Sequence, residues 1–177
     1  MNMKIMLRNV VLLAMVLLLT AMWLSSGSAA GDDRGQTFPD VSDALWKEEC
    51  AACHMLYSPG MLPARSWVRM MRELEDHFGD NASLQPEKAE QIQAFLVAAA
   101  ADNPQATLYM RRIASTIPAT ESPQRFSETR FFHYIHDDIP SGVWKRESIA
   151  TPANCVACHT RADEGRYPER EIRIPKK

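Results

Sequence analysis

Two copies of the pattern Cys-x-x-Cys-His constrain this chain more than any other feature of its sequence. The copies lie at residues 50–54 and 155–159, and together they contain all four cysteines. In this pattern both thiols can form thioethers with the vinyl groups of one haem, and the histidine that follows directs its imidazole at the iron. The sequence therefore predicts two covalently attached haem c groups, haem 1 at residues 50–54 and haem 2 at residues 155–159. The predicted attachment residues are Cys50, Cys53, Cys155 and Cys158, and the predicted proximal ligands are His54 and His159.

Two other interpretations of paired cysteines fit the sequence less well. Four cysteines can bind one structural zinc ion, but zinc does not explain why a histidine follows both pairs directly. A Cys-x-x-Cys pair can also be a thioredoxin-like redox site. Such sites lie in folds with alternating strands and helices, and no strand pattern is evident in this sequence.

The first 30 residues have the order of features found in secretory signal peptides. Lys4 and Arg8 precede an apolar run over residues 10–24, and small residues at 28–30 offer a cleavage site. An uncleaved membrane anchor is the alternative, but this run is shorter than the roughly 20 residues that span a bilayer. We expect a signal peptide over residues 1–30, a flexible leader over residues 31–40, no membrane span after cleavage, and a periplasmic location.

The charge of the exported chain argues against a nucleic-acid partner. Without Lys4 and Arg8, 18 basic residues remain against 22 acidic ones. Binding to nucleic acid needs a clustered basic face. The mildly acidic balance therefore favours other classes of partner.

Hydrophobic spacing predicts a mainly α fold. Helices are expected over residues 41–50, 64–78 and 86–101, with a loop over residues 55–63. Three helices around one haem motif resemble a small cytochrome c domain, which we place at residues 41–108. Prolines interrupt the sequence after residue 104. We therefore expect a second domain over residues 109–177, less regular, that wraps haem 2 with loops and short helices.

His77 is the predicted distal ligand of haem 1. In the expected second helix it shares an apolar face with Trp67, Met70 and Leu74, so its imidazole would point away from the charged side chains. Methionine sulfur is the alternative ligand. The candidate methionines are Met61, Met70, Met71 and Met110.

The distal ligand of haem 2 has two candidates, His133 and His136. They lie three residues apart, so one helical turn would direct both to the same side. His136 is nearer to Asp137 and Asp138, whose carboxylates could bind a ring nitrogen. Residue types alone barely prefer His136.

Several segments together resemble the dihaem cytochrome c family. They are Leu-Pro-Ala-Arg-Ser-Trp at 62–67, His-Phe-Gly-Asp-Asn-Ala-Ser-Leu at 77–84, the segment around His136, Pro-Ala-Asn-Cys-Val-Ala-Cys-His-Thr at 152–160, and Glu-Arg-Glu-Ile-Arg-Ile-Pro at 169–175. The resemblance covers most of the chain from about Trp46 onward. It implies two domains, an N-terminal half like ordinary cytochrome c and a less regular C-terminal half.

The same resemblance implies ligands and partners. Both haems would be low-potential and bound by two histidines, with His77 and His136 as distal ligands, whereas His133 departs from the family pattern. The implied acceptor is an oxygen-binding monohaem cytochrome c, and a membrane cytochrome b is a candidate donor.

Three functions are compatible with these predictions. The favoured one is an electron carrier, not an enzyme, because two histidine ligands leave the iron no open position for a substrate. A small dihaem subunit of a periplasmic reductase would also transfer electrons, but with a large fixed partner. A haem enzyme or gas-binding protein would need one iron site left open.

Overall fold

The computed structural model describes residues 38–39 and 42–176 of the chain. The expected signal peptide and all of the expected leader except residues 38–39 lie outside this part. Within the described residues, no helix is both long and apolar enough to cross a membrane.

The first described helix leads into the first haem motif. Helix α2 covers Ala44–Cys50, and the Asp43 carboxylate caps it by accepting from the backbone N–H of Trp46 at 2.7 Å. Such a cap satisfies an amide that has no partner inside the helix. The motif therefore begins on the last residue of α2, as predicted, although the helix starts three residues later than the spacing indicated.

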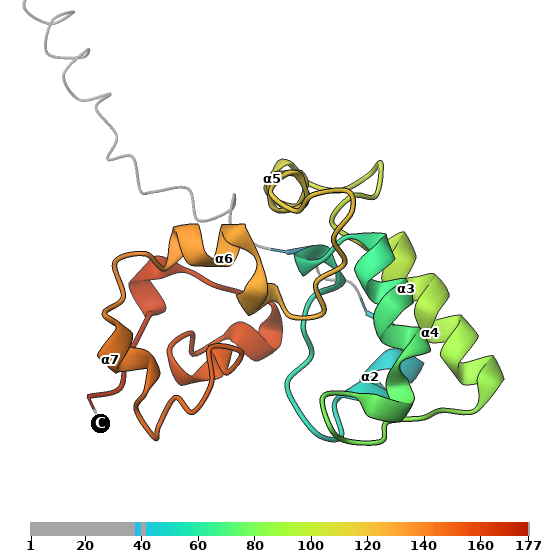
Figure 1. Ribbon diagram of the computed structural model, residues 1–177, viewed down its shortest axis with the longest axis horizontal. Coiled ribbons are helices and arrows are strands. Elements are labelled where there is room, and N and C mark those ends of the chain that lie inside the picture. Colours follow the sequence, from blue (N-terminus) through green and yellow to red (C-terminus); the bar gives the residue numbers. More distant parts are fainter. Residues whose placement is uncertain (1–37, 40–41, 177) are drawn as a thin grey trace, which may run out of the picture. The chain divides into compact units, whose positions relative to one another are not determined.

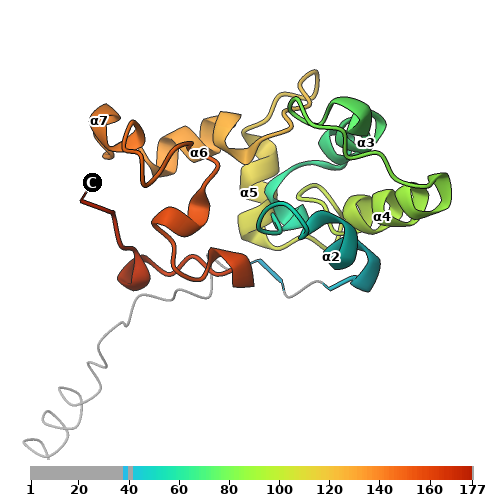
Figure 2. The ribbon, with the colours of Figure 1, turned by 90° about the horizontal axis from the view of Figure 1, so that it is seen from below.

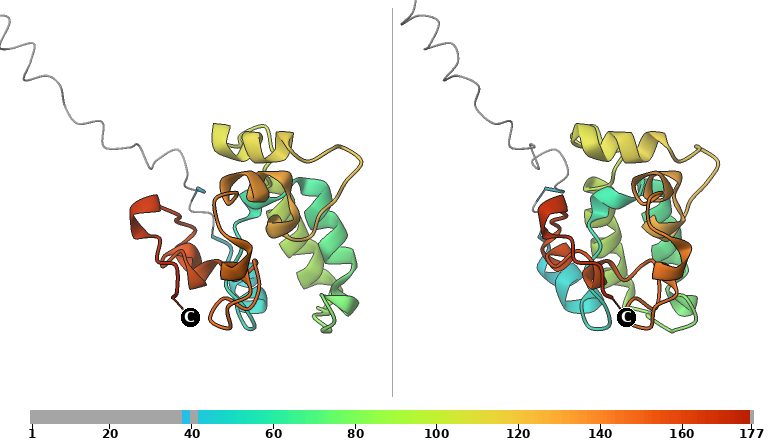
Figure 3. Two further views of the ribbon diagram at one scale, coloured as in Figure 1. Left: turned by 60° about the vertical axis from the view of Figure 1, so that its left-hand side comes forward. Right: turned by 90° about the vertical axis from the view of Figure 1, so that its left-hand side faces the viewer.

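Helices α3 (Ala64–Arg72) and α4 (Pro86–Ala98) pack side by side (Figure 3). Both begin where the sequence predicted, next to a proline that suits the first turn of a helix. The prediction that one helix runs from 64 to 78 was wrong, because α3 ends at Arg72. A short 3₁₀ turn, Leu74–Asp76, follows and leads into a tight turn at His77.

The second half of the chain contains only short helices (Figure 1). They are α5 (Leu108–Ser115), α6 (Arg130–Ile135) and α7 (Ser141–Trp144). Single 3₁₀ turns cover Pro59–Met61, Phe126–Glu128, Cys155–Ala157, Ala162–Glu164 and Glu169–Glu171. The residues that the structure describes form no strand, only two isolated bridges, so the predicted mainly α class is confirmed.

One hydrophobic core joins residues from both halves. It includes Trp46 of α2, Trp67 of α3, Ile92 and Leu96 of α4, Met110 and Ile113 of α5, and Phe131 of α6. In Figure 2, α5 lies between the α3–α4 pair and α6. The ring of Tyr109 on α5 contacts that of Phe131 at 5.6 Å. A boundary at residue 108 stays a prediction, and the core crosses that position.

Candidate functional site

Two pairs of histidine rings are the main feature of the candidate site. The centroids of His54 and His77 lie 6.1 Å apart with their planes inclined by 25°. Those of His136 and His159 are also 6.1 Å apart, but their planes are perpendicular at 88°. The structure thus brings each histidine of a Cys-x-x-Cys-His motif together with one of the predicted distal histidines.

His54 follows the end of α2, and a backbone carbonyl holds its ring. Its Nδ1 lies 2.6 Å from the carbonyl oxygen of Met55. With the proton on Nδ1, the other nitrogen, Nε2, is left as the electron donor to a metal. The ring of Tyr57 lies 5.4 Å away and covers part of the imidazole.

His77 lies at the base of a tight turn and not on a helix face. The N–H of His77 donates to the carbonyl of Asp80 at 2.7 Å, and the N–H of Asp80 donates back at 3.3 Å. The two central residues, Phe78 and Gly79, have positive φ values of 59° and 99°. Positive φ at both central positions is the signature of a type I′ turn. The prediction that His77 lies on a helical face was therefore wrong. The structure nevertheless brings the ring of His77 to that of His54.

His136 is placed by the end of helix α6. It follows Ile135 directly, and its Nδ1 lies 2.9 Å from the carbonyl oxygen of Phe132. The centroid of its ring lies 4.2 Å from that of Phe132, with the planes tilted by 32°, and 5.7 Å from that of Trp144. The sequence suggested Asp137 and Asp138 as partners of this ring. A carbonyl one turn earlier takes that role because the ring folds back along the helix.

His133 lies on α6, three residues before His136. Its side chain is exposed, and its ring meets Phe132 edge-on at 5.8 Å. The two histidines diverge because α6 ends between them, so the helical spacing stops before His136. The structure brings only His136 to His159.

Each ring pair fits two imidazoles on one iron. Two metal–nitrogen bonds of about 2 Å and two ring half-widths of about 1 Å give a centroid separation of about 6 Å. Burial lowers the pKa of His77, His136 and His159 below the usual range for an imidazole. A lower pKa favours the neutral ring, which is the form that binds metals.

The cysteines do not form a zinc site. None of the four is in a disulfide. Burial raises the pKa of the Cys50 and Cys155 thiols to about 11. Between residues 42 and 176, no three His, Cys, Asp or Glu side chains converge in a group that could hold a metal ion. Two histidines per iron suffice only when another group, such as a porphyrin, supplies the remaining ligands.

The four candidate methionines belong to the packing of the core. Met61 and Met110 are almost fully buried in it, and Met70 and Met71 pack against it half-buried. The sequence missed three aromatic side chains that surround the histidine rings. Tyr57 covers His54, Trp144 contacts His136, and Tyr167 meets His159 at 5.3 Å. Nothing in their local sequence marks them, because Tyr57 and Tyr167 lie outside the helices and Trp144 ends a helix of only four residues.

Comparison with known proteins gives a consistent result. The family model for dihaem cytochrome c matches residues 46–167. The chain is 40% identical to the diheme cytochrome c from Rhodobacter sphaeroides, with 72% of this chain and 98% of that chain covered and a TM-score of 0.62. To DHC purified from Rhodobacter sphaeroides it is 38% identical, with 72% of this chain and 98% of that chain covered and a TM-score of 0.58. To the diheme cytochrome sb-DHC from Shewanella baltica OS155 it is 33% identical, with 75% of this chain and 93% of that chain covered and a TM-score of 0.61. No curated protein matches the chain.

Proposed function

The chain belongs to the dihaem cytochrome c family, and from this premise we propose that it is an electron carrier whose two irons are each bound by two histidines. As a family member it carries two covalently attached haem c groups, and its function is electron transfer. The proposed ligand pairs are His54 with His77, and His159 with His136. The observation that carries the proposal is the separation of 6.1 Å within each ring pair.

The cysteines and histidines of each motif would act together. Cys50 and Cys53 would hold haem 1 by thioethers, and Cys155 and Cys158 would hold haem 2. The haem irons supply the one-electron chemistry, which cycles between ferric and ferrous states. Two histidines on each iron would leave no position for a ligand from solution, so the site would pass electrons without binding a substrate.

Both haems are proposed to have low reduction potentials. A methionine thioether raises the potential of a haem, whereas a second imidazole leaves it lower. In His54 and His136 a backbone carbonyl accepts from Nδ1, which makes the imidazole a stronger donor and favours the ferric state further. Both potentials should therefore be negative on the hydrogen scale.

The proposed location and partners rest on the sequence. The features of residues 1–30 support export to the periplasm. The family resemblance supports an oxygen-binding monohaem cytochrome c as the electron acceptor and a membrane cytochrome b as a candidate donor. Isolation of the chain from native periplasm, with reduced-minus-oxidised spectra of the proteins that accompany it, tests this part.

A carbon monoxide experiment tests the ligand pairs. The purified protein should have a mass that includes two haems. Its dithionite-reduced spectrum should not change under carbon monoxide, because neither iron has an open position. Rapid binding of carbon monoxide to wild-type protein would instead support a gas-binding protein or enzyme.

A further inference from the structure

Hydrogen bonds fasten the segment that joins α5 to the Phe126–Glu128 turn onto helix α3. The guanidinium of Arg65 donates to the carbonyl oxygen of Glu121 at 2.6 Å, and that of Arg69 donates to the carbonyl oxygen of Ser122 at 3.1 Å. The Gln124 amide donates to the carboxylate of Glu73, the C-cap of α3, at 2.9 Å. These bonds join residues more than 50 positions apart in the sequence. Residues 121–124 are therefore held in place along α3.

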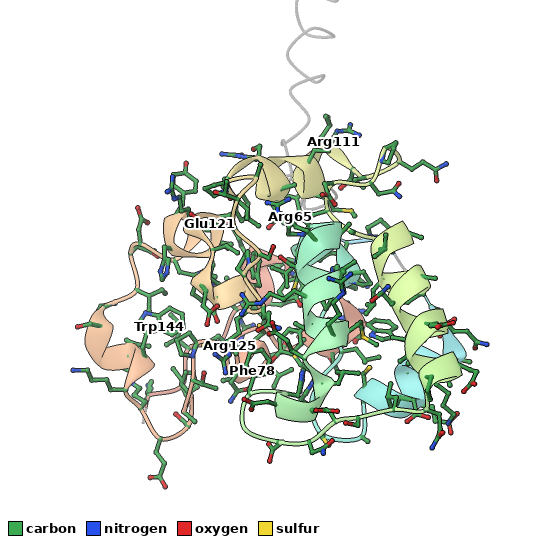
Figure 4. The ribbon with its side chains drawn as sticks, turned by 45° about the vertical axis from the view of Figure 1, so that its right-hand side comes forward. Arg65, Phe78, Arg111, Glu121, Arg125 and Trp144 are labelled. Atoms are coloured by element: carbon green, nitrogen blue, oxygen red, sulfur yellow. The ribbon has the colours of Figure 1, made fainter. Side chains whose placement is uncertain are left out.

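Arg125 follows this fastened segment directly and lies over the ring of Phe78. Its guanidinium carbon is 3.8 Å from the ring centroid, and the two side chains lie together in Figure 4. A guanidinium at this distance is attracted to the face of an aromatic ring. Its Nη1 also lies 3.2 Å from the carboxylate of Glu128. The fastened segment, the ring and the carboxylate together give the cation a defined position although its side chain is 43% exposed.

Phe78 in turn lies against the distal histidine candidate of haem 1. Its ring centroid is 4.8 Å from that of His77. Phe78 has a positive φ of 59° and is 44% exposed, and Arg125 lies over its ring. Arg125 thus lies over the Phe78 ring, and that ring in turn contacts the imidazole of His77.

We propose that Arg125, held over Phe78, is a positioning residue that raises the reduction potential of haem 1. The proposal rests on the His54–His77 pair proposed above. Reduction lowers the charge of the iron by one unit, so a fixed cation near its ligand stabilises the reduced state more than the oxidised state. The Glu128 carboxylate opposes this effect in part. Because Arg125 is partly exposed, salt screens its contribution.

Redox titrations of charge variants test the proposal. Arg125→Gln should lower the potential of haem 1 and leave that of haem 2 unchanged, with a shift that shrinks as ionic strength rises. Arg125→Lys keeps the charge and should restore most of the wild-type potential. Glu128→Gln removes the opposing charge and should shift haem 1 upward. Haem 1 is identified as the component whose titration changes in His77→Ala.

Arg112→Gln is the matched control, since Arg112 also lies over an aromatic ring, that of Tyr134, at 5.9 Å. Arg112 lies on α5 and its partner Tyr134 on α6 is 63% exposed, whereas the aromatic partner of Arg125 contacts His77. Its removal should leave both potentials unchanged. Equal shifts in Arg125→Gln and Arg112→Gln, or no shift of haem 1 in Arg125→Gln and Glu128→Gln, would overturn the proposal.

The carbon monoxide response separates this inference from the ligand assignment. If wild-type haem 1 binds carbon monoxide, the His54–His77 pair is wrong whatever Arg125 does. If wild-type and Arg125→Gln proteins both exclude carbon monoxide, the coordination is intact and the potential alone decides the inference. If Arg125→Gln loses the distal ligand, the Glu128→Gln variant decides the inference. A higher potential of haem 1 in that variant supports the inference, and an unchanged or lower one overturns it.

Discussion

The imidazole rings of His136 and His159 stand perpendicular to each other, at 88°, with their centroids 6.1 Å apart. The rings of His54 and His77 have the same separation and an inclination of only 25°. The carbonyl oxygen of Phe132 fixes the ring of His136 through Nδ1. The two candidate haem sites therefore differ in the orientation of their rings and not in their spacing.

This difference predicts two distinct electron paramagnetic resonance signals from the oxidised protein. An imidazole interacts with the iron dπ orbital that lies across its ring plane. Nearly parallel rings act on the same orbital and separate the two dπ levels, whereas perpendicular rings leave the levels close together. Haem 1 should give a rhombic low-spin signal and haem 2 a strongly anisotropic one. Two identical rhombic signals would contradict the geometry of the second pair.

Replacement of His77 by alanine should open haem 1 alone. Without the distal imidazole, the reduced haem should bind carbon monoxide, while haem 2 remains six-coordinate because its ligands come from another part of the chain. Absorption spectra with and without carbon monoxide measure this. Met70→Leu is the control, because Met70 packs half-buried against the core. An unchanged spectrum in His77→Ala together with an altered one in Met70→Leu would make methionine the ligand.

The sequence predicts the attachment motifs well because all their chemistry lies within five consecutive residues. Distal ligands are harder to predict, because they are brought in by the fold. The spacing of apolar residues predicts His77 on a helical face, yet α3 ends at Arg72 and a turn with two positive φ values carries the histidine. Spacing along the chain does not reveal such a turn, although Gly79 offers a local signal for one.

In the second half of the chain, too, sequence spacing does not predict where the short helices begin and end. Helix α5 is only eight residues long, and the sequence does not predict it as a separate helix. Thr107 nevertheless caps it by accepting from the N–H of Met110. His133 and His136 could not be separated because the end of α6 between them was not visible in the sequence. Short helices that end in loops depend on tertiary packing more than on their own periodicity.

Three variants decide which histidine serves haem 2. His133→Ala should leave the spectrum and the carbon monoxide response unchanged, because His133 is exposed and the structure pairs His136 with His159. His136→Ala should open haem 2, unless the last turn of α6 unwinds and brings His133 to the iron. The double variant removes that substitute, so it should bind carbon monoxide in full. Carbon monoxide binding by His133→Ala alone would reverse the assignment.

Two glycines give a matched test of the His77 turn. Neither Gly79 nor Gly142 has an atom within 4 Å of the position that a Cβ would take, so alanine fits sterically at both. Only Gly79 has a positive φ, of 99°, whereas Gly142 lies in helix α7. Gly79→Ala should lower the free energy of unfolding by about 1–2 kcal/mol. Gly142→Ala should be neutral or stabilise by up to about 1 kcal/mol. Denaturant unfolding measures both, and equal effects would argue against the turn.

Tyr57 links the regions of the two haem motifs. Its hydroxyl donates to the carbonyl oxygen of Ala153 at 2.8 Å, two residues before Cys155, while its ring lies 5.4 Å from that of His54. Tyr57→Phe keeps the ring and removes only the hydrogen bond, so it should lower the free energy of unfolding by about 1 kcal/mol. Tyr134→Phe is the control, because that side chain is 63% exposed and its loss of a hydroxyl should change stability by less than about 0.5 kcal/mol. Denaturant unfolding followed at the Soret band distinguishes the two. Equal stabilities of wild-type and Tyr57→Phe proteins would mean that solvent replaces this bond.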